Sequence, residues 1–261
     1  MNRKLALIGV IVLILACSQG IWAAALKVGA TPVPHAEILE QVVPLLAKQG
    51  ITLEVVEFTD YVRPNLALHD GDLDANFFQH VPYLEAFNQD AGTDLAAIAG
   101  IHVEPLGIFS GKYASLDELP ARASIAIPND ATNGGRALLL LQAAGLIELD
   151  PEAGITPTVF DVTANKLQLR LVELEAAQLV RSLPDVAAAV INGNYALQAG
   201  LNPVRDAIFL EGAESPYVNV LAVRAEDVDR ADLKQLVEAL LTEEIRQFIL
   251  DKYQGAVVPV F

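Results

Sequence analysis

The clearest chemical potential in this chain lies in the stretch Asn129 to Leu141, NDATNGGRALLLL, where a polar turn with two glycines leads into an apolar run. A helix that begins inside this stretch would leave its first backbone N–H groups unpaired, and Gly134 and Gly135 would let an anion approach them. Arg136 adds a permanently charged, forked donor that can hold a carboxylate or a small phosphate through two parallel hydrogen bonds. The same pattern also fits a capped helix whose arginine pairs with a nearby acid.

Aromatic side chains gather at a second place, where a predicted strand meets a predicted helix. Ligands of doubly wound α/β folds bind at the carboxyl ends of strands, so rings at such a junction can line an apolar slot. The residues concerned are Phe77, Phe78, His80 and Tyr83 in DANFFQHVPY, together with Tyr61 upstream. Alternation along the strand separates Phe77 from Phe78, so one of the two is expected in the core. The alternative is that these side chains only pack.

Two asparagines and one glutamate follow apolar strands and could complete a site. Asn192 lies in AAAVINGNYA and Asn219 in SPYVNVLAVR. A side-chain amide can donate to a carboxylate and accept from an ammonium group, which suits a zwitterion. Glu104, in HVEP, is a candidate partner for the ammonium group. Each asparagine alone also fits a turn residue that bonds its own backbone. Together with Arg136, they predict a cleft for an α-amino acid with an apolar side chain.

Catalysis and metal binding have less support. The sequence contains no G-x-S-x-G elbow, H-E-x-x-H pair, P-loop or dinucleotide fingerprint. The four histidines, His35, His69, His80 and His102, lack close metal-ligand spacing, although distant residues could converge on a metal ion. We therefore expect a binding protein without a metal or other cofactor, and keep metal capture and an enzyme on a related fold as alternatives.

The elements that must position these residues alternate between short apolar runs and helical periods. Strands are expected at LKVGA, ITLEVVEF, LDANFF, AAIAGIHVE, LGIFS, ASIAIP, LRLVEL, AAAVIN, AIFLEG and VNVLAVR, and helices at 37–48, 81–89, 137–144, 175–182 and 231–253. This β/α alternation predicts parallel sheets with helices on both faces. The capping-box pattern Ser115–Glu118 predicts a short helix at a lobe boundary. We predict an α/β fold with two lobes, 26–109 with 223–261 and 110–222, joined by two crossover segments that form a hinge.

The N-terminal residues 1–25 are typical of an export signal. Basic residues precede the apolar run Leu5–Ala16, which is shorter than the roughly 20 residues that a permanent membrane span needs. Leu15-Ala16-Cys17 resembles a lipoprotein cleavage box, whereas Ala23–Ala25 offers a site for ordinary signal peptidase. Either route predicts an exported protein, soluble or anchored through an acylated Cys17. A net charge of −16 without a basic cluster argues against nucleic acid as a partner.

Seven blocks of sequence, in order, resemble the methionine-binding lipoprotein (NlpA/MetQ) family. They are TPVPHAEILE, FTDYVRPN, LDANFFQHVPYL, IPNDATNGGRALLLLQ, VELEAAQL, AVINGNYAL and SPYVNVL, and they span nearly all of the chain after residue 25.

The resemblance implies a two-lobed, type II periplasmic-binding-protein fold that closes on methionine and delivers it to an inner-membrane permease and its ATPase. It also implies that Arg136 binds the ligand carboxylate, that Asn192 and Asn219 hold the amino-acid backbone, and that an aromatic wall surrounds the thioether. By position, that wall consists of Tyr61, Phe78, His80 and Tyr83. A monomer is expected, and L-methionine, D-methionine, a methionine-containing dipeptide and another apolar amino acid all remain open as ligands.

Overall fold

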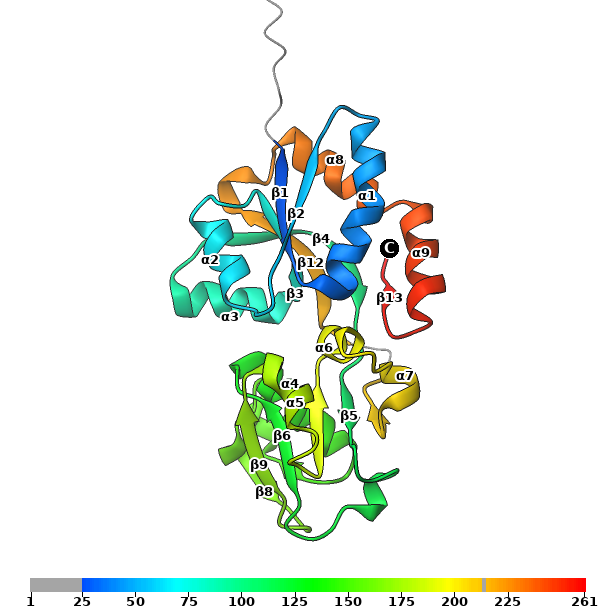
Figure 1. Ribbon diagram of the computed structural model, residues 1–261. Coiled ribbons are helices and arrows are strands. Elements are labelled where there is room, and N and C mark those ends of the chain that lie inside the picture. The colour runs from blue at the N-terminus through cyan, green and yellow to red at the C-terminus, as the bar shows by residue number, and fades with distance from the viewer. Residues whose placement is uncertain (1–24, 213–214) are drawn as a thin grey trace, which may run out of the picture.

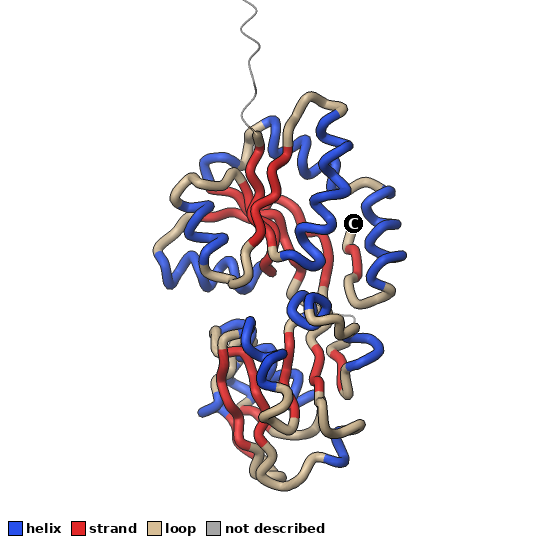
Figure 2. The backbone as a smooth tube through the Cα atoms, in the orientation of Figure 1, coloured by secondary structure: helices blue, strands red, loops and turns tan. Residues whose placement is uncertain are grey.

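The computed structural model describes residues 25–212 and 215–261, which form two lobes, each built around its own β-sheet (Figures 1 and 2). In spatial order, the first sheet contains β13 (Val258–Pro259), β4 (Leu95–Val103), β12 (Val218–Arg224), β3 (Ala75–His80), β1 (Leu26–Ala30) and β2 (Leu53–Glu57). The second contains β11 (Phe209–Leu210), β5 (Gly107–Phe109), β10 (Ala188–Ile191), β6 (Ser124–Pro128) and β9 (Arg170–Leu174). A small ribbon pairs β7 (Glu148–Leu149) with β8 (Val162–Ala164). The predicted two-lobed α/β fold is confirmed.

The sheets are mixed rather than purely parallel as predicted. The strands of the β/α units pair in parallel, as in β1 with β2 and β3, and β6 with β9 and β10. Strand β12 is antiparallel to both β3 and β4, and β5 is antiparallel to β10. The reason is the crossing between lobes: β4 leads out of the first lobe and β12 leads back into it, so the two must run in opposite directions.

Helices cover both faces of each sheet, and each face has its own core. In the first lobe, α1 (Glu37–Ala47), α8 (Ala231–Leu240) and α9 (Glu243–Tyr253) pack on one face, and α2 (Arg63–His69) and α3 (Val81–Ala91) lie on the other (Figure 1). Strand β12 alternates between these cores, with Leu221 in one and Val220 in the other. In the second lobe the helices are α4 (Ala131–Ala143), α5 (Leu179–Ser182), α6 (Gly193–Gln198) and α7 (Pro203–Asp206).

Several predicted helices have different bounds in the structure. The predicted helix 231–253 is two helices, because Thr242 adopts an extended conformation and its Oγ1 accepts from the Ile245 backbone N–H at 3.5 Å as an N-cap. The predicted helix 175–182 is a 3-10 turn, Ala176–Gln178, followed by the four-residue α5. The predicted capping box does not form, since the Ser115 side chain caps nothing and Glu118 accepts from the Ala114 backbone N–H at 3.0 Å, and the turn Leu116–Glu118 is only three residues long.

The two crossings lie between β4 and β5 and between β11 and β12. Strand β5 pairs in the second sheet and β12 in the first, whereas the predicted division placed residues 107–109 in the first lobe and 218–222 in the second. Both crossing strands are apolar like their neighbours, so hydropathy alone does not reveal which sheet they join. The predicted export signal, residues 1–25, falls almost entirely outside the described residues, as does Cys17.

The burial of Phe77 allows a test of the fold. Phe77 is fully buried in the core beneath α1, so Phe77→Ala should lower the free energy of unfolding by about 3 to 5 kcal/mol in urea denaturation. The matched control is Phe160→Ala, because Phe160 is 92% exposed and its removal should change stability by less than about 0.5 kcal/mol. Equal effects of the two substitutions would contradict this packing.

Candidate ligand-binding site

A small cavity with a free volume of about 20 Å³ lies where the two lobes meet. All eight residues singled out from the sequence line it: Tyr61, Phe78, His80, Tyr83, Glu104, Arg136, Asn192 and Asn219. Four further residues complete the lining: Gln79, Asn133, Gly193 and Asn194. The residues come from β3 and α3 of the first lobe, from α4 and α6 of the second, and from the crossing segments. The structure thus gathers the predicted set, and its contact with a ligand stays a prediction.

Aromatic rings form one end of the cavity. Tyr61 is the central ring, with centroid distances of 5.9 Å to Phe78, 5.8 Å to Tyr83 and 5.0 Å to Tyr195 of the second lobe. The Tyr83 hydroxyl donates to the Tyr61 backbone carbonyl at 3.0 Å, which fixes the Tyr83 side chain. Tyr61 lies in the loop between β2 and α2, two residues before that helix begins at Arg63. These rings give the cavity an apolar end with little freedom to move.

Arg136 lies on α4 and is 4% exposed, with most of its donors already in use. Its Nε donates to Glu211 at 3.0 Å, and its Nη2 bonds the other Glu211 oxygen and the Glu104 carbonyl, the latter at 2.8 Å. The guanidinium carbon lies 4.2 Å from the centroid of the Tyr217 ring. Among the described residues, Nη1 has no hydrogen-bond partner. Glu211 therefore takes the Nε–Nη2 edge of the guanidinium and Nη1 is the nitrogen left for a ligand, so the contact of Arg136 with a ligand carboxylate stays a prediction.

The N-terminus of α4 is not the open anion-binding site that the sequence suggested. Asp130 is its N-cap, and its carboxylate accepts from the Asn133 backbone N–H at 2.8 Å, so an anion from the chain already occupies the helix end. The two glycines also serve packing. A Cβ at Gly134 would lie 2.9 Å from the Pro128 carbonyl, and one at Gly135 would lie 2.7 Å from the Cα atom of residue 156.

The Asp130 carboxylate also fixes the orientation of two amides that line the cavity. Asn133 Nδ2 donates to both Asp130 oxygens, at 2.9 and 3.0 Å, and a carboxylate can only accept, so Asn133 Oδ1 must point the other way. That oxygen accepts from Asn192 Nδ2 at 2.7 Å. As a result Asn192 Oδ1 is the free end of its amide, buried and without a partner among the described residues.

His80 joins this network from the first lobe. Its Nδ1 accepts from the backbone N–H of Tyr83 at 3.1 Å, so Nε2 must carry the ring proton. Nε2 lies 3.2 Å from Asn133 Oδ1 and donates to it across the cleft. A second contact across the cleft joins the Tyr61 hydroxyl to Asn194 Oδ1 at 2.6 Å, which leaves Asn194 Nδ2 buried and without a partner among the described residues.

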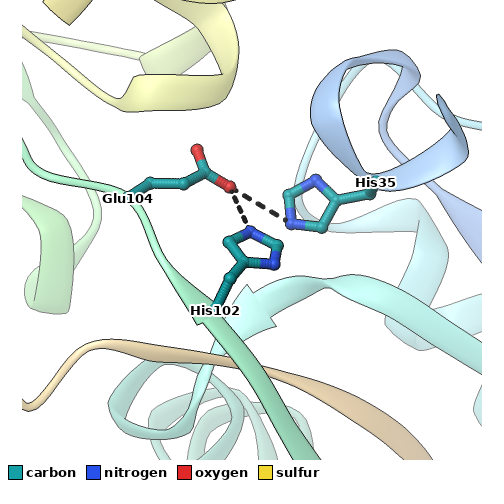
Figure 3. A group of neighbouring side chains, drawn as sticks. All are labelled: His35, His102 and Glu104. Atoms are coloured by element: carbon teal, nitrogen blue, oxygen red, sulfur yellow. Dashed lines mark hydrogen bonds and ion pairs between the residues drawn. The ribbon is translucent and has the colours of Figure 1, made fainter. Parts of the chain in front are cut away.

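A second carboxylate, the buried Glu104, lies at the crossing out of β4 between two histidines (Figure 3). Its Oε1 lies 2.9 Å from His102 Nε2 and 3.3 Å from His35 Nε2. The backbone N–H of Asn194 also donates to it. Gly193 makes the approach possible, because a Cβ there would lie 2.9 Å from Glu104 Oε2. From the sequence, His35 was considered only as one of four widely spaced histidines. No residue near it in the sequence indicates its contact with Glu104.

The same three side chains could hold a metal ion. One donor atom each from His35, His102 and Glu104 lies within 4.8 Å of the others, and all three residues are buried. Imidazole and carboxylate ligands of this kind suit zinc. A bound ion would replace the protons that now lie between the two imidazoles and the Glu104 carboxylate. The histidines converge from positions that are distant in sequence, the possibility that spacing alone left open.

Burial dominates the ionisation of the titratable residues in and beside the cavity. It lowers the pKa of His35 to about 4 and the pKa values of His80 and His102 to about 3, so all three imidazoles are neutral at pH 7. Burial raises the pKa of Glu104, and this is opposed by His35, by Arg136 and by the hydrogen bond from the Asn194 backbone. The three imidazoles therefore act as neutral hydrogen-bonding groups, each with one donor and one acceptor nitrogen.

Comparison with known proteins gives a consistent set of matches. The NlpA lipoprotein family model matches residues 26–261. The D-methionine-binding lipoprotein MetQ of Escherichia coli K12 is 47% identical over 213 residues, covering 81% of this chain and 79% of its own. The membrane lipoprotein TpN32 of Treponema pallidum is 42% identical, covering 97% and 94%. A crystal structure of a nutrient-binding protein from Burkholderia cenocepacia bound to methionine superimposes with a TM-score of 0.87 at 46% identity, covering 91% of this chain and all of that one.

The buried histidines predict a loss of stability in acid. Their pKa values are lower in the folded than in the unfolded chain, so their contribution is complete above pH 6.5 and falls as the pH drops toward about 4. Each histidine should reduce the free energy of unfolding by about 1.4 kcal/mol per pH unit in that window. The raised pKa of Glu104 works in the opposite direction and offsets part of this loss.

Urea denaturation between pH 7 and pH 4.5 measures this slope. The variant His102→Gln keeps a donor near Glu104 but does not titrate, and its slope should be shallower by about 1.4 kcal/mol per pH unit. An identical slope in the two proteins would show that His102 is not buried as a neutral ring.

Proposed function

Because the chain belongs to the NlpA lipoprotein family, we propose that it is the substrate-binding protein of an ATP-binding-cassette importer, and that it binds methionine in the cavity between its lobes. The observation that carries this proposal is the arrangement of free donors and acceptors around the cavity. It matches a zwitterion with an apolar tail.

The free donors suit the carboxylate of the ligand. Arg136 Nη1, Asn194 Nδ2 and Asn219 Nδ2 make no hydrogen bond to any described residue, and all three residues line the cavity. The free acceptors suit the ammonium group: Asn192 Oδ1 is buried without a partner among the described residues, and the Glu104 carboxylate adds negative charge. An α-amino acid presents both groups on one carbon atom, so it can use donors and acceptors in one small polar region.

The aromatic end of the cavity suits the thioether. Tyr61, Phe78 and Tyr83 present ring edges and faces from the first lobe, and sulfur beside an aromatic ring gains roughly 0.3 to 1.5 kcal/mol per contact. Phe78 is 3% exposed, so a side chain placed against it is removed from water. This supports methionine over small or charged amino acids.

The lobes are held together by direct hydrogen bonds, as expected for a closed form. Tyr61 bonds Asn194, His80 bonds Asn133, and the Tyr195 hydroxyl donates to the Thr59 carbonyl at 3.2 Å. A ligand that bridges donors of one lobe and rings of the other favours this form, because it binds the closed state more tightly than the open one. The closed protein then delivers its ligand to an inner-membrane permease and its ATPase subunit.

The protein acts outside the cytoplasm and without catalysis. Its relatives are named lipoproteins, and residues 1–25 read as an export signal, with Cys17 as the acylation site or Ala25 as the end of a cleaved signal. No helix of the described residues is long and apolar enough to span a bilayer. The polar groups of the cavity are engaged in holding one another in place, which suits binding and release of an unchanged ligand.

The role of Arg136 can be tested without leaving its partner as a lone buried charge. Glu211→Gln alone should bind methionine as tightly as the wild type, because it frees rather than removes the guanidinium. Arg136→Gln in the Glu211→Gln background should lose about 10- to 150-fold in affinity by isothermal titration calorimetry, the value of one charge-assisted hydrogen bond. Unchanged affinity in the double variant would remove Arg136 from the binding site.

The contribution of the ring at Phe78 can be separated from apolar burial by comparing two ligands. Norleucine has a methylene in place of the methionine sulfur. Phe78→Leu should lower the affinity for methionine by about 2- to 12-fold and the affinity for norleucine by less, because only methionine loses a contact between sulfur and the ring. If calorimetry gives equal losses for both ligands, Phe78 acts only through its volume.

A further inference from the structure

We propose that His35, which does not line the cavity, is a positioning residue that fixes which end of the Asn219 amide faces the ligand. It thereby makes this side of the cavity specific for a carboxylate. The inference rests on the proposed function, because it concerns how the same cavity selects an amino acid. It begins with the contacts of a single nitrogen atom, His35 Nε2.

His35 Nε2 lies between two oxygen atoms, 3.3 Å from Glu104 Oε1 and 3.1 Å from Asn219 Oδ1 (Figure 3 shows the first contact). When Glu104 is ionised its carboxylate can only accept, and Nε2 then carries the ring proton. The other ring nitrogen, Nδ1, lies 2.7 Å from Thr31 Oγ1 and accepts from that hydroxyl. Both nitrogens therefore support the same tautomer, with the N–H directed at Glu104 and Asn219.

The ring cannot turn away from this arrangement. His35 is 1% exposed, and its ring meets that of Phe77 edge-on at 4.7 Å and that of His102 at 5.1 Å. His102 also donates to Glu104 Oε1, at 2.9 Å, so a second imidazole helps to hold the carboxylate in its place. The direction of the His35 N–H is thus fixed by packing as well as by hydrogen bonds.

The backbone of Asn219 is fixed by the sheet, so its amide has one remaining choice. It lies on β12, opposite His80 of β3 and His102 of β4. The observed orientation places Oδ1 against His35 and leaves Nδ2 for the cavity. The reversed orientation would place an NH2 group against the His35 N–H, which would then donate to Glu104 alone, and would leave Asn219 Nδ2 facing another donor, which should disfavour it roughly 5- to 150-fold. Nδ2 therefore presents a donor to the ligand.

The opposite orientation of Asn192 gives independent support. Its NH2 group is held by Asn133, which is oriented by Asp130, so Asn192 directs an oxygen into the cavity. The two asparagines thus present opposite ends of the same chemical group. Each is oriented through a relay that begins at a carboxylate, which gives a site with one donor amide and one acceptor amide rather than two interchangeable ones.

The test compares methionine with methioninamide in two variants. Methioninamide carries an amide, both donor and acceptor, in place of the carboxylate, so it can pair with Asn219 in either orientation. In His35→Leu the ratio of the affinity for methionine to the affinity for methioninamide, measured by calorimetry, should fall at least about fivefold. His35→Gln places a side-chain NH2 near the same point, and should restore most of that preference. If His35 had only a structural role, its replacement would lower the affinities for both ligands by the same factor, and this result would overturn the proposal.

Direct observation of the tautomer tests the proposal in the unmodified protein, whether or not the variants fold. Long-range ¹H–¹⁵N spectra should show His35 protonated at Nε2 and not at Nδ1. An Nδ1-protonated ring would overturn the proposal. So would a stoichiometric metal ion in the purified protein whose removal by a chelator abolishes methionine binding, because His35 Nε2 would then be a ligand. Failure of the wild type to bind methionine would instead refute the proposed function.

Discussion

Two carboxylates, the half-buried Asp130 and the buried Glu104, determine the direction of the hydrogen bonds around the cavity. Neither can donate when ionised, so each forces the polar groups next to it into one orientation, and these groups orient the next. Asp130 acts through Asn133 on Asn192, and Glu104 acts through His35 on Asn219. A buried network that is fully directed in this way is rigid before a ligand arrives, which reduces the cost of binding.

The fold explains how these carboxylates reach one cavity. Glu104 follows β4 at the crossing between lobes, and Asp130 caps α4 at the carboxyl end of β6, so each lies at an edge of its sheet that faces the other lobe. The return strand β12 brings Asn219 between His80 and His102. Closure of the lobes therefore assembles the donors, the acceptors and the aromatic slot in a single step.

Sequence patterns were sufficient for the two-lobed α/β fold and for eight residues that line the cavity, because strand ends and aromatic clusters are local features. Partners across the fold were not accessible in the same way. The Arg136 guanidinium pairs with Glu211, 75 residues away, and no local signal distinguishes that pairing from a ligand contact. His35 meets Glu104 and Asn219 only through folding. The break at Thr242 was missed because the apolar period continues across it.

The most direct test of the account is native mass spectrometry of the protein, unfolded to release any bound molecule, refolded, and incubated with an equimolar mixture of the common amino acids and zinc chloride. The directed donors and acceptors, together with the aromatic slot, predict one bound molecule per chain with the mass of methionine. A bound zinc ion, a different amino acid or a protein that remains empty would contradict the account.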